Sequence, residues 1–374
     1  MAEARCLPRR LDERHISLQV SATVSDNLGL EIGNARSIKA QLQVMESSKS
    51  YDVVTLGETM ARFTPPGYER FGQSRAVEMH VAGSESNTAI GLARLGHRVC
   101  WLSRLSDNAI GRWIAEEIAS HGVDISNVVW TDNDRVGTFY MERGVPPRSS
   151  QVFYDRAESA IARMRPEELP SDLFLGQASR IFHTSGITLG LSSQAKQTTL
   201  RAIELARGAG QLISFDLNFR SRLWKASAAY AVCGPVMAQA DFIFLPIRDA
   251  ESVCGVAHTE PVSICRELRD RWPQATIVLT RGSLGAVAID KSGEFFEQPA
   301  FPAVEVERLG GGDAFSAGYL SAVLSGQNTG DALRWGCATA AIKYTIPGDL
   351  PLIDRASIAA LVDAKSPLGA SIQR

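Results

Sequence analysis

The chain has 374 residues, of which 45% are hydrophobic and 21% are charged, and its formal net charge is −2. This composition is typical of a globular protein, and the balanced charge argues against a nucleic-acid partner or a polybasic membrane surface. No apolar run approaches the roughly 20 residues that cross a bilayer, so we expect no membrane partner.

The six cysteines are scattered and form no CxxC pair. A zinc site or a disulfide framework is therefore not expected, and a reducing cytoplasm fits this pattern.

Residues 1–50 differ from the rest of the chain, because they mix arginine and glutamate with short apolar pieces and show no sustained period. No apolar stretch follows the basic residues near Met1, so the segment is a poor secretory signal. We expect a flexible or loosely docked extension here, followed by one domain over residues 51–374.

The first half of that domain mixes strands and helices. Strands are predicted at Tyr51–Leu56 and Val99–Leu102, and helices at Thr88–Leu95 and Ala109–His121. The stretch Phe63–Val81 is rich in proline and glycine and shows no helical period. Two further β-like runs, Thr138–Glu142 and Gln151–Tyr154, alternate weakly, as a solvent-facing sheet would.

After Pro170 strands alternate with helices, which predicts an α/β fold with a parallel, helix-covered sheet. Strands are expected at Arg180–His183, Leu212–Asp216, Phe242–Leu245 and Thr276–Leu279, and a hairpin at Ala286–Ile289 and Phe295–Gln298. Helices are expected at Ser193–Arg207, Ser227–Ala240, Pro261–Trp272, Ala314–Leu324, Asp331–Thr345 and Ala356–Asp363.

The stretch Arg308–Leu320 reads RLGGGDAFSAGYL and is the strongest candidate for a functional site. Glycine lets the backbone approach a ligand closely, and a helix N-terminus attracts anions. Gly310, Gly311 and Gly312 could therefore form an anion hole, with Asp313 as a general base. A glycine turn with Asp313 as a simple N-cap is the alternative.

Other polar clusters follow predicted strands, where ligands bind in open α/β sheets. Asn218 and Arg220 follow one strand, and Thr280–Gly285 follows another. The first pair could bind a carboxylate or phosphate and the second a nucleotide, although a surface loop and a tight turn are the respective alternatives. Tyr154 and Arg156 share one side of a β-like run and could clamp an acidic substrate, or could simply end a solvated hairpin.

From Tyr51 onward the chain resembles ribokinase-like sugar kinases of the phosphofructokinase-B family, and within it the 2-keto-3-deoxygluconate kinases. Gly310–Asp313 matches the family's Gly-Ala-Gly-Asp loop, and Ala82–Asn87 resembles its N-terminal glycine motif. The runs HVAGSESNTAI, HTSGITLGLS, DLNFRSRLW and AIKYTIPGD resemble the keto-deoxygluconate kinase subgroup.

The resemblance implies a three-layer fold with a mostly parallel central sheet and a small β lid from about residues 62–81 and 135–154. It also implies ATP-dependent phosphorylation of a sugar acid, with Mg²⁺ bridging ATP oxygens and no direct protein metal ligand assigned. Substrate-binding positions of the family correspond to Gly83, Asn87, Phe139, Tyr154, Arg156, Arg220, Asp313 and Asp349. Nucleotide positions correspond to Asn218, Thr280, Gly282, Gly285, Gly310 and Gly312. We also expect a homo-oligomer.

Three single positions and one motif depart from the family pattern. Phe139 replaces a common tyrosine, and Glu307 replaces the usual aspartate before the glycine turn. Gly311 replaces alanine, which predicts a feasible but looser turn. The family's Asn-x-x-Glu motif aligns with Ile247 and Ala250, so Asp249 or Glu251 would have to substitute near the metal.

Three other functions remain open. A kinase for fructose or a nucleoside would share the fold, but two arginines at the substrate are not needed for a neutral sugar. A catalytically silent sugar-acid sensor is the second alternative, and the intact Asp313 argues against it. A dinucleotide oxidoreductase is the third, but the glycine run lacks the GxGxxG spacing after a strand.

Overall fold

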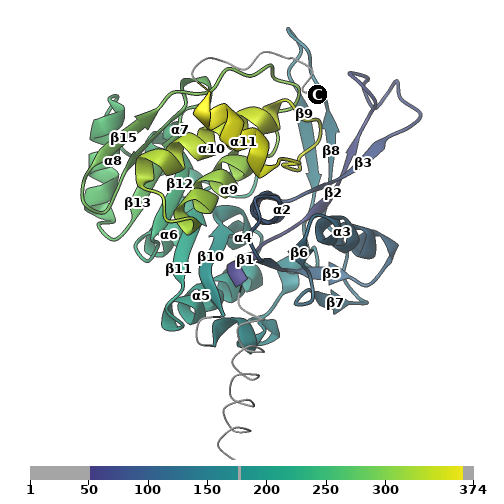
Figure 1. The fold of residues 1–374 in the computed structure, drawn as a ribbon. Helices are drawn as coiled ribbons and strands as arrows, with labels where there is room; N and C mark the ends of the chain where they lie inside the picture. Colours follow the sequence, from purple (N-terminus) through teal and green to yellow (C-terminus); the bar gives the residue numbers. More distant parts are fainter. Residues whose placement is uncertain (1–50, 176–177, 365–374) are drawn as a thin grey trace, which may run out of the picture. The chain divides into compact units, whose positions relative to one another are not determined.

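The computed structural model describes residues 51–175 and 178–364 (Figure 1). The extension expected over residues 1–50 lies outside the described residues. Within the described ranges, no helix is both long and apolar enough to cross a membrane. The cysteines of these ranges are free and buried.

A nine-stranded sheet forms the centre of the domain, in the order β15-β14-β13-β12-β11-β10-β1-β4-β6. All neighbours from β6 to β13 are parallel, whereas β13, β14 and β15 are antiparallel. The strands are β1 (Tyr51–Leu56), β4 (Val99–Leu102), β6 (Val123–Asp124), β10 (Ser179–Ser185), β11 (Leu212–Asp216), β12 (Phe242–Pro246), β13 (Thr276–Thr280), β14 (Ala286–Ile289) and β15 (Phe295–Gln298). The predicted parallel sheet and its terminal hairpin are confirmed.

Helices cover both faces of this sheet. They are α2 (Ser84–Arg94), α3 (Ala109–Ser120), α4 (Gly186–Gly190), α5 (Ser193–Gly208), α6 (Ala226–Met237), α7 (Ile247–Ser252), α8 (Pro261–Arg271), α9 (Gly311–Leu324), α10 (Thr329–Tyr344) and α11 (Arg355–Asp363). Successive residues of β1 point to opposite faces, so Val53 packs in one apolar cluster and Val54 in another. Helices α2, α9 and α10 contribute to the first cluster, and α5, α6 and α8 to the second, which gives three layers.

A separate four-stranded sheet has the order β3-β2-β8-β9. Its strands are β2 (Met60–Thr64), β3 (Glu78–Ala82), β8 (Thr138–Glu142) and β9 (Gln151–Asp155). Strands β8 and β9 lie where the sequence predicted them. Strands β2 and β3 fall largely within the β lid that the resemblance implied from about residue 62 to residue 81, but no individual strand was predicted there, because Phe63–Val81 shows no helical period or clear alternation. Cross-strand pairing aligns Arg62 with Phe139, and Phe139 with Tyr154, on one face of this sheet.

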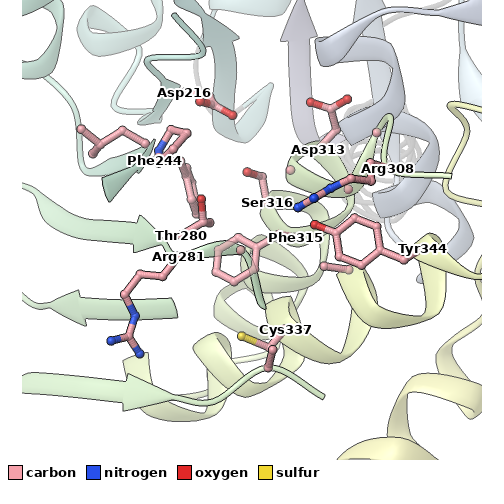
Figure 2. Close-up of a pocket in the computed structure, with 18 of the residues that line it drawn as sticks. Asp216, Phe244, Thr280, Arg281, Arg308, Asp313, Phe315, Ser316, Cys337 and Tyr344 are labelled. Atoms are coloured by element: carbon pink, nitrogen blue, oxygen red, sulfur yellow. The ribbon is translucent and has the colours of Figure 1, made fainter. Parts of the chain in front are cut away.

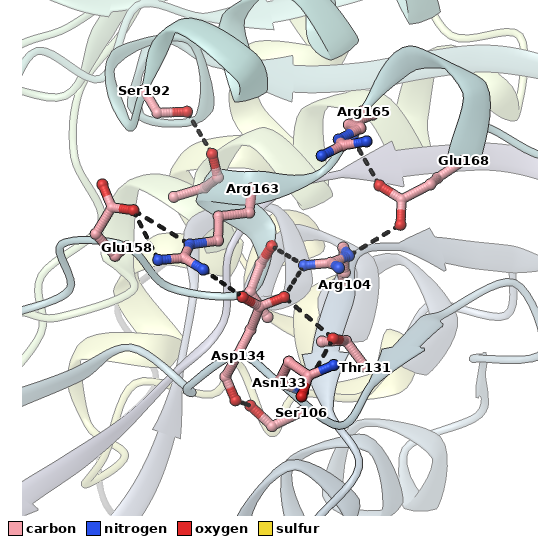
Figure 3. Close-up of polar contacts among 12 residues, drawn as sticks. Arg104, Ser106, Thr131, Asn133, Asp134, Glu158, Arg163, Arg165, Glu168 and Ser192 are labelled. Atoms are coloured by element: carbon pink, nitrogen blue, oxygen red, sulfur yellow. Dashed lines mark hydrogen bonds and ion pairs between the residues drawn. The ribbon is translucent and has the colours of Figure 1, made fainter.

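A two-stranded sheet, β5 (Arg104–Ser106) with β7 (Val129–Thr131), is joined to nearby irregular chain by ion pairs (Figure 3). Arg104 pairs with Asp134 and with Glu168. Arg163 pairs with Asp134 and with Glu158. The Asp134 side chain is only 5% exposed and links both arginines, of which Arg104 is 14% and Arg163 46% exposed.

Candidate active site

A cavity of about 530 Å³ opens beside the carboxyl ends of β11, β12 and β13 and the N-terminus of α9 (Figure 2). Every residue that was predicted to bind the nucleotide lines this cavity, and so does the glycine turn. Its wall includes Asp216, Asn218, Arg220, Thr280, Gly282, Gly285, Gly310, Gly311, Gly312 and Asp313. The expected placement of the polar clusters at one edge of the sheet is therefore confirmed.

The glycine turn starts the helix earlier than the sequence predicted. Gly310 has φ +73° and is the N-cap, so α9 begins at Gly311 rather than at Ala314. Asp313 stands in the first turn of the helix, and its side chain does not cap the helix. The reading of Asp313 as a simple N-cap is therefore wrong.

Two of the three glycines pack closely against a later part of the chain. A Cβ on Gly310 would lie 2.0 Å from the carbonyl oxygen of Asp349, and one on Gly311 would lie 2.3 Å from the Tyr344 ring. The Tyr344 ring occupies the space that an alanine methyl at position 311 would need, so an alanine there would require the ring to shift. A Cβ on Gly312 would meet nothing within 4 Å, so this residue faces open space.

The backbone at this turn can receive an anion. The first N–H groups of a helix have no acceptor within it. Here the N–H of Gly311 donates to the carbonyl of Arg308, and that of Ala314 to the carbonyl of Gly310. The N–H groups of Gly312 and Asp313 are the ones left for a ligand among these first-turn residues, and the helix dipole favours negative charge there.

Asp313 is held by the N-terminus of α2. Ser84 Oγ donates to Asp313 Oδ1 at 2.7 Å, and Asn87 Nδ2 donates to Oδ2 at 2.8 Å. Burial raises the pKa of Asp313, and the hydrogen bonds from Asn87 and Ser84 and the charge of Arg220 oppose that rise. Each carboxylate oxygen thus has one hydrogen bond and keeps capacity for another.

Ser84 was missed by the sequence reading, although its i, i+3 spacing from Asn87 places both on one helix face. Asn218 was expected to contact nucleotide, and it lines the cavity, but its Nδ2 donates to Ser84 Oγ at 2.7 Å. Asn218 has φ +40° and is buried. It therefore supports the chain of donors that ends on Asp313.

A second carboxyl group, Asp216, also lines the cavity and was not predicted as a site residue. Figure 2 shows Asp216 and Asp313 toward the same end of the cavity. Burial and the charge of Asp313 raise the pKa of Asp216 to about 8, although Arg220 opposes the shift. Two carboxyl groups with mutual repulsion form an environment that attracts a cation.

The loop after β13 supplies the opposite wall. Gly282 has φ +61° and Gly285 has φ +94°. A Cβ on Gly285 would lie 2.1 Å from the carbonyl oxygen of Gln298, so only glycine fits there. An apolar part of the wall comprises Phe301, Phe315, Ala340, Ala341 and Tyr344. A flat aromatic base could pack against such a surface.

The expected substrate residues divide into two groups. Arg220 and Asp313 line the cavity, and Arg220 is exposed, with no carboxylate hydrogen-bonded to it in the described chain. The remaining predicted positions are absent from the cavity wall: Gly83, Asn87, Phe139, Tyr154, Arg156 and Asp349. Of these, Asn87 still contacts Asp313 directly.

Two of the expected substrate contacts are already engaged with protein groups. Arg156 Nε donates to Glu58 Oε2 at 2.7 Å, and the side chains are 10% and 1% exposed. Asp349 Oδ2 accepts from Arg62 at 2.6 Å. Gly83 is the N-cap of α2. The rings of Phe139 and Tyr154 lie beside each other, with their centroids 5.6 Å apart.

The region of the missing Asn-x-x-Glu motif offers few ligands. Ile247 and Arg248 line the cavity, whereas Asp249 is buried behind it and Glu251 is exposed. Burial raises the pKa of Asp249. Within the described residues there is no group of three or more His, Cys, Asp or Glu that could hold a metal ion.

The structure thus combines a parallel sheet, a glycine turn at a helix N-terminus and a carboxylate held beside that turn. The family model "pfkB family carbohydrate kinase" matches residues 50–353. The chain belongs to this family of carbohydrate kinases.

Individual relatives agree. The chain is 40% identical over 302 residues to a 2-dehydro-3-deoxygalactonokinase of Haloferax volcanii, covering 81% of this chain and 93% of the relative. It is 31% identical over 316 residues to a 2-dehydro-3-deoxygluconokinase of Bacillus subtilis, covering 84% and 96%. A solved 2-dehydro-3-deoxygluconokinase of Thermotoga maritima superimposes with a TM-score of 0.77 at 28% identity, covering 83% and 99%.

Proposed function

We propose that the protein transfers the γ-phosphoryl group of ATP to a hydroxyl of a 2-keto-3-deoxy sugar acid, forming the 6-phosphate of 2-keto-3-deoxygluconate or its galactonate epimer. The names of the two relatives support the substrate class. The observation that carries the proposal is the Asp313 carboxylate, held by Ser84 and Asn87 in the first turn of α9.

In this mechanism Asp313 accepts the proton of the attacking hydroxyl. The hydroxyl oxygen forms a bond to the γ-phosphorus while the bond from that phosphorus to the bridging β–γ oxygen breaks, leaving ADP. Ser84 and Asn87 fix the orientation of the carboxylate and leave each oxygen able to accept a further hydrogen bond. The N–H groups of Gly312 and Asp313 stabilise charge on the transferring group.

The cavity fits ATP. It offers an apolar wall for a base and a glycine-rich loop at Gly282–Gly285. The open backbone at Gly312 can receive phosphate oxygens. Mg²⁺ would be held near Asp216 and Asp313, whose mutual repulsion a cation would relieve, with water and phosphate supplying most of its ligands. Bound there, it would neutralise phosphate charge.

Arg220 is the residue that we assign to the substrate carboxylate. It is exposed in the cavity wall and forms no close ion pair with a carboxylate of the described residues, whereas Arg156 is paired with Glu58. The four-stranded sheet, which contributes Phe139 and Tyr154, is proposed as the lid over the substrate. A kinase for a neutral sugar remains the second candidate, because the pairing of Arg156 with Glu58 leaves only Arg220, of the two arginines, to bind a substrate carboxylate.

A coupled assay of ADP release tests the proposal. The purified protein is supplied with ATP, Mg²⁺ and, separately, 2-keto-3-deoxygluconate, 2-keto-3-deoxygalactonate, fructose and ribose. We expect kcat/KM to be highest for a sugar acid, and ³¹P NMR of that product to show a 6-phosphate ester. Preference for fructose or ribose would contradict the proposal and favour the second candidate.

A further inference from the structure

A buried ion pair joins the four-stranded sheet to the loop after α10. Arg62, on β2, is fully buried, and its Nη1 lies 2.6 Å from Asp349 Oδ2. The Nε and Nη2 atoms of Arg62 are buried without a hydrogen-bond partner in the described chain. The pair with Asp349 is therefore the main compensation for a desolvated guanidinium.

Asp349 also packs directly on the glycine turn. Its carbonyl oxygen would lie 2.0 Å from a Cβ on Gly310, so this backbone contact depends on the glycine. The same loop is fixed from the other side by Lys343, whose buried ammonium donates to the carbonyls of Ile346 at 3.1 Å and Gly348 at 2.9 Å. The loop after α10 is thus held by Lys343 and packs against Gly310, at the beginning of the glycine turn.

The chain that enters the glycine turn is tied to the same sheet. Glu307 is buried three residues before Gly310, and its Oε2 lies 3.3 Å from Arg143 Nε and 3.8 Å from Arg62 Nη1. Arg143 follows β8 directly. Arg62 therefore faces carboxylates on both sides of the turn, Glu307 before it and Asp349 packed against it.

We propose that Arg62 is a positioning residue for phosphoryl transfer, which holds the glycine turn in place through Asp349 and Glu307. This inference rests on the proposed function, because it takes the turn to be the phosphoryl site. Donors stabilise a transition state only at hydrogen-bond distance, and a displacement of about 1 Å can cost roughly 100-fold in rate. Arg62 acts through the backbone at Gly310 and need not touch ATP.

Kinetics of Arg62→Lys and Asp349→Asn provide the first test. We expect kcat to fall roughly 10- to 100-fold while the KM for ATP changes little, because the interaction that is lost acts mainly in the transition state. The double variant Arg62→Met/Asp349→Leu removes both charges, and such replacements often restore stability. We expect its Tm to recover and its kcat to stay low. If both Tm and kcat recovered in the double variant, the ion pair between Arg62 and Asp349 would have a purely structural role, and the proposal would be overturned.

Hydrogen–deuterium exchange gives a readout that needs no substrate. In the same variants, the peptide containing Arg308–Leu320 should exchange faster, and the peptide from α8, Pro261–Arg271, should not change. Unchanged exchange at the turn, or an equal increase in both peptides, would overturn the proposal. If the wild type phosphorylates no sugar acid but the turn peptide responds, the proposed function fails and the link between Arg62 and the turn stands.

Discussion

Asp313 is the residue on which the proposed chemistry depends. Asparagine has a similar shape but cannot take a proton from the substrate. We expect Asp313→Asn to lower kcat by about 10²–10⁴-fold, the usual contribution of a general base, with sugar binding largely retained. The measurements are turnover in the coupled assay and sugar affinity by calorimetry.

Ser84→Ala serves as a graded comparison, because it removes one donor to Asp313 and leaves the carboxylate. Its loss of rate should be smaller. Near-normal turnover of Asp313→Asn would remove Asp313 from the role of base.

Arg308 was not singled out as a site residue from the sequence, but its side chain lines the cavity (Figure 2). Its Nη2 lies 4.0 Å from the position of a Cβ on Gly282. Its ion pair with Glu305 is long, at 3.5 Å, and both side chains are more than half exposed, so Glu305 holds it weakly.

We therefore expect Arg308→Ala to raise the KM for ATP roughly ten-fold or more, since a hydrogen bond to a charged group contributes about 1.5–3 kcal/mol. The KM for the sugar acid should change far less. Arg266→Ala, on the exposed side of α8, is the control. An unchanged ATP constant in Arg308→Ala would show that this arginine does not bind phosphate.

Arg220 and Arg156 should behave differently when removed. Arg220→Ala should raise the sugar-acid KM roughly 10- to 100-fold at unchanged Tm, from a loss of about 1.5–3 kcal/mol. Arg156→Ala should also lower Tm, because it leaves the buried Glu58 without its guanidinium partner. Kinetics and thermal denaturation of both variants test this.

Arg222→Ala is the matched control for that pair, as an exposed arginine outside the cavity wall. If Arg220→Ala leaves the sugar-acid KM unchanged, the carboxylate is bound elsewhere. If Arg156→Ala leaves Tm unchanged, the Glu58 pair adds little to stability.

At the scale of elements, Asp134 holds β5 to the irregular chain through Arg104 and Arg163 (Figure 3). Burial by itself would raise the pKa of Asp134, but hydrogen bonds from Arg104 and Thr131 and the charges of both arginines lower it overall. A carboxyl group with a lowered pKa stabilises the fold above its unfolded pKa, about 3.9, and loses that contribution as pH falls through the folded value.

Asp134→Asn should therefore lower Tm by several degrees at pH 7, and the difference from wild type should shrink below about pH 4. Thermal denaturation between pH 7 and pH 3 measures this. The neighbouring exposed Asp132→Asn should cause little change at either pH. A pH-independent difference for Asp134→Asn would show that packing, and not charge, is responsible.

At the scale of the whole molecule, the central sheet begins with β1 at Tyr51, and the family match begins at residue 50. We expect a chain that starts at Ser50 to keep its Tm within about 2 °C and its kcat within about two-fold. The control is a chain that starts at Gly57 and lacks β1. Because β1 lies between β10 and β4 in the middle of the sheet, this shorter chain should not fold. A large loss of Tm in the Ser50 chain would show that the first 49 residues contribute to stability.

The sequence by itself determined most of the fold and grouped the residues to which we assign catalysis. Strand and helix periodicity placed the parallel sheet, because both patterns are local and repeat within a few residues. In open α/β sheets, ligands bind beyond the carboxyl ends of the strands, which predicted that Asn218, Thr280–Gly285 and Gly310–Asp313 lie together. The structure confirms that these residues line one cavity.

Only the tertiary structure decided which charged side chains are paired within the protein and which remain available to bind a ligand. Arg62 and Asp349 are separated by 287 residues in the sequence, and Arg156 and Glu58 by 98. No local sequence pattern could therefore predict either ion pair. The physical reason is that a buried charge must find a partner wherever the fold puts one. The tight glycine turn followed likewise from Asp349 and Tyr344, which pack against it from a later part of the chain.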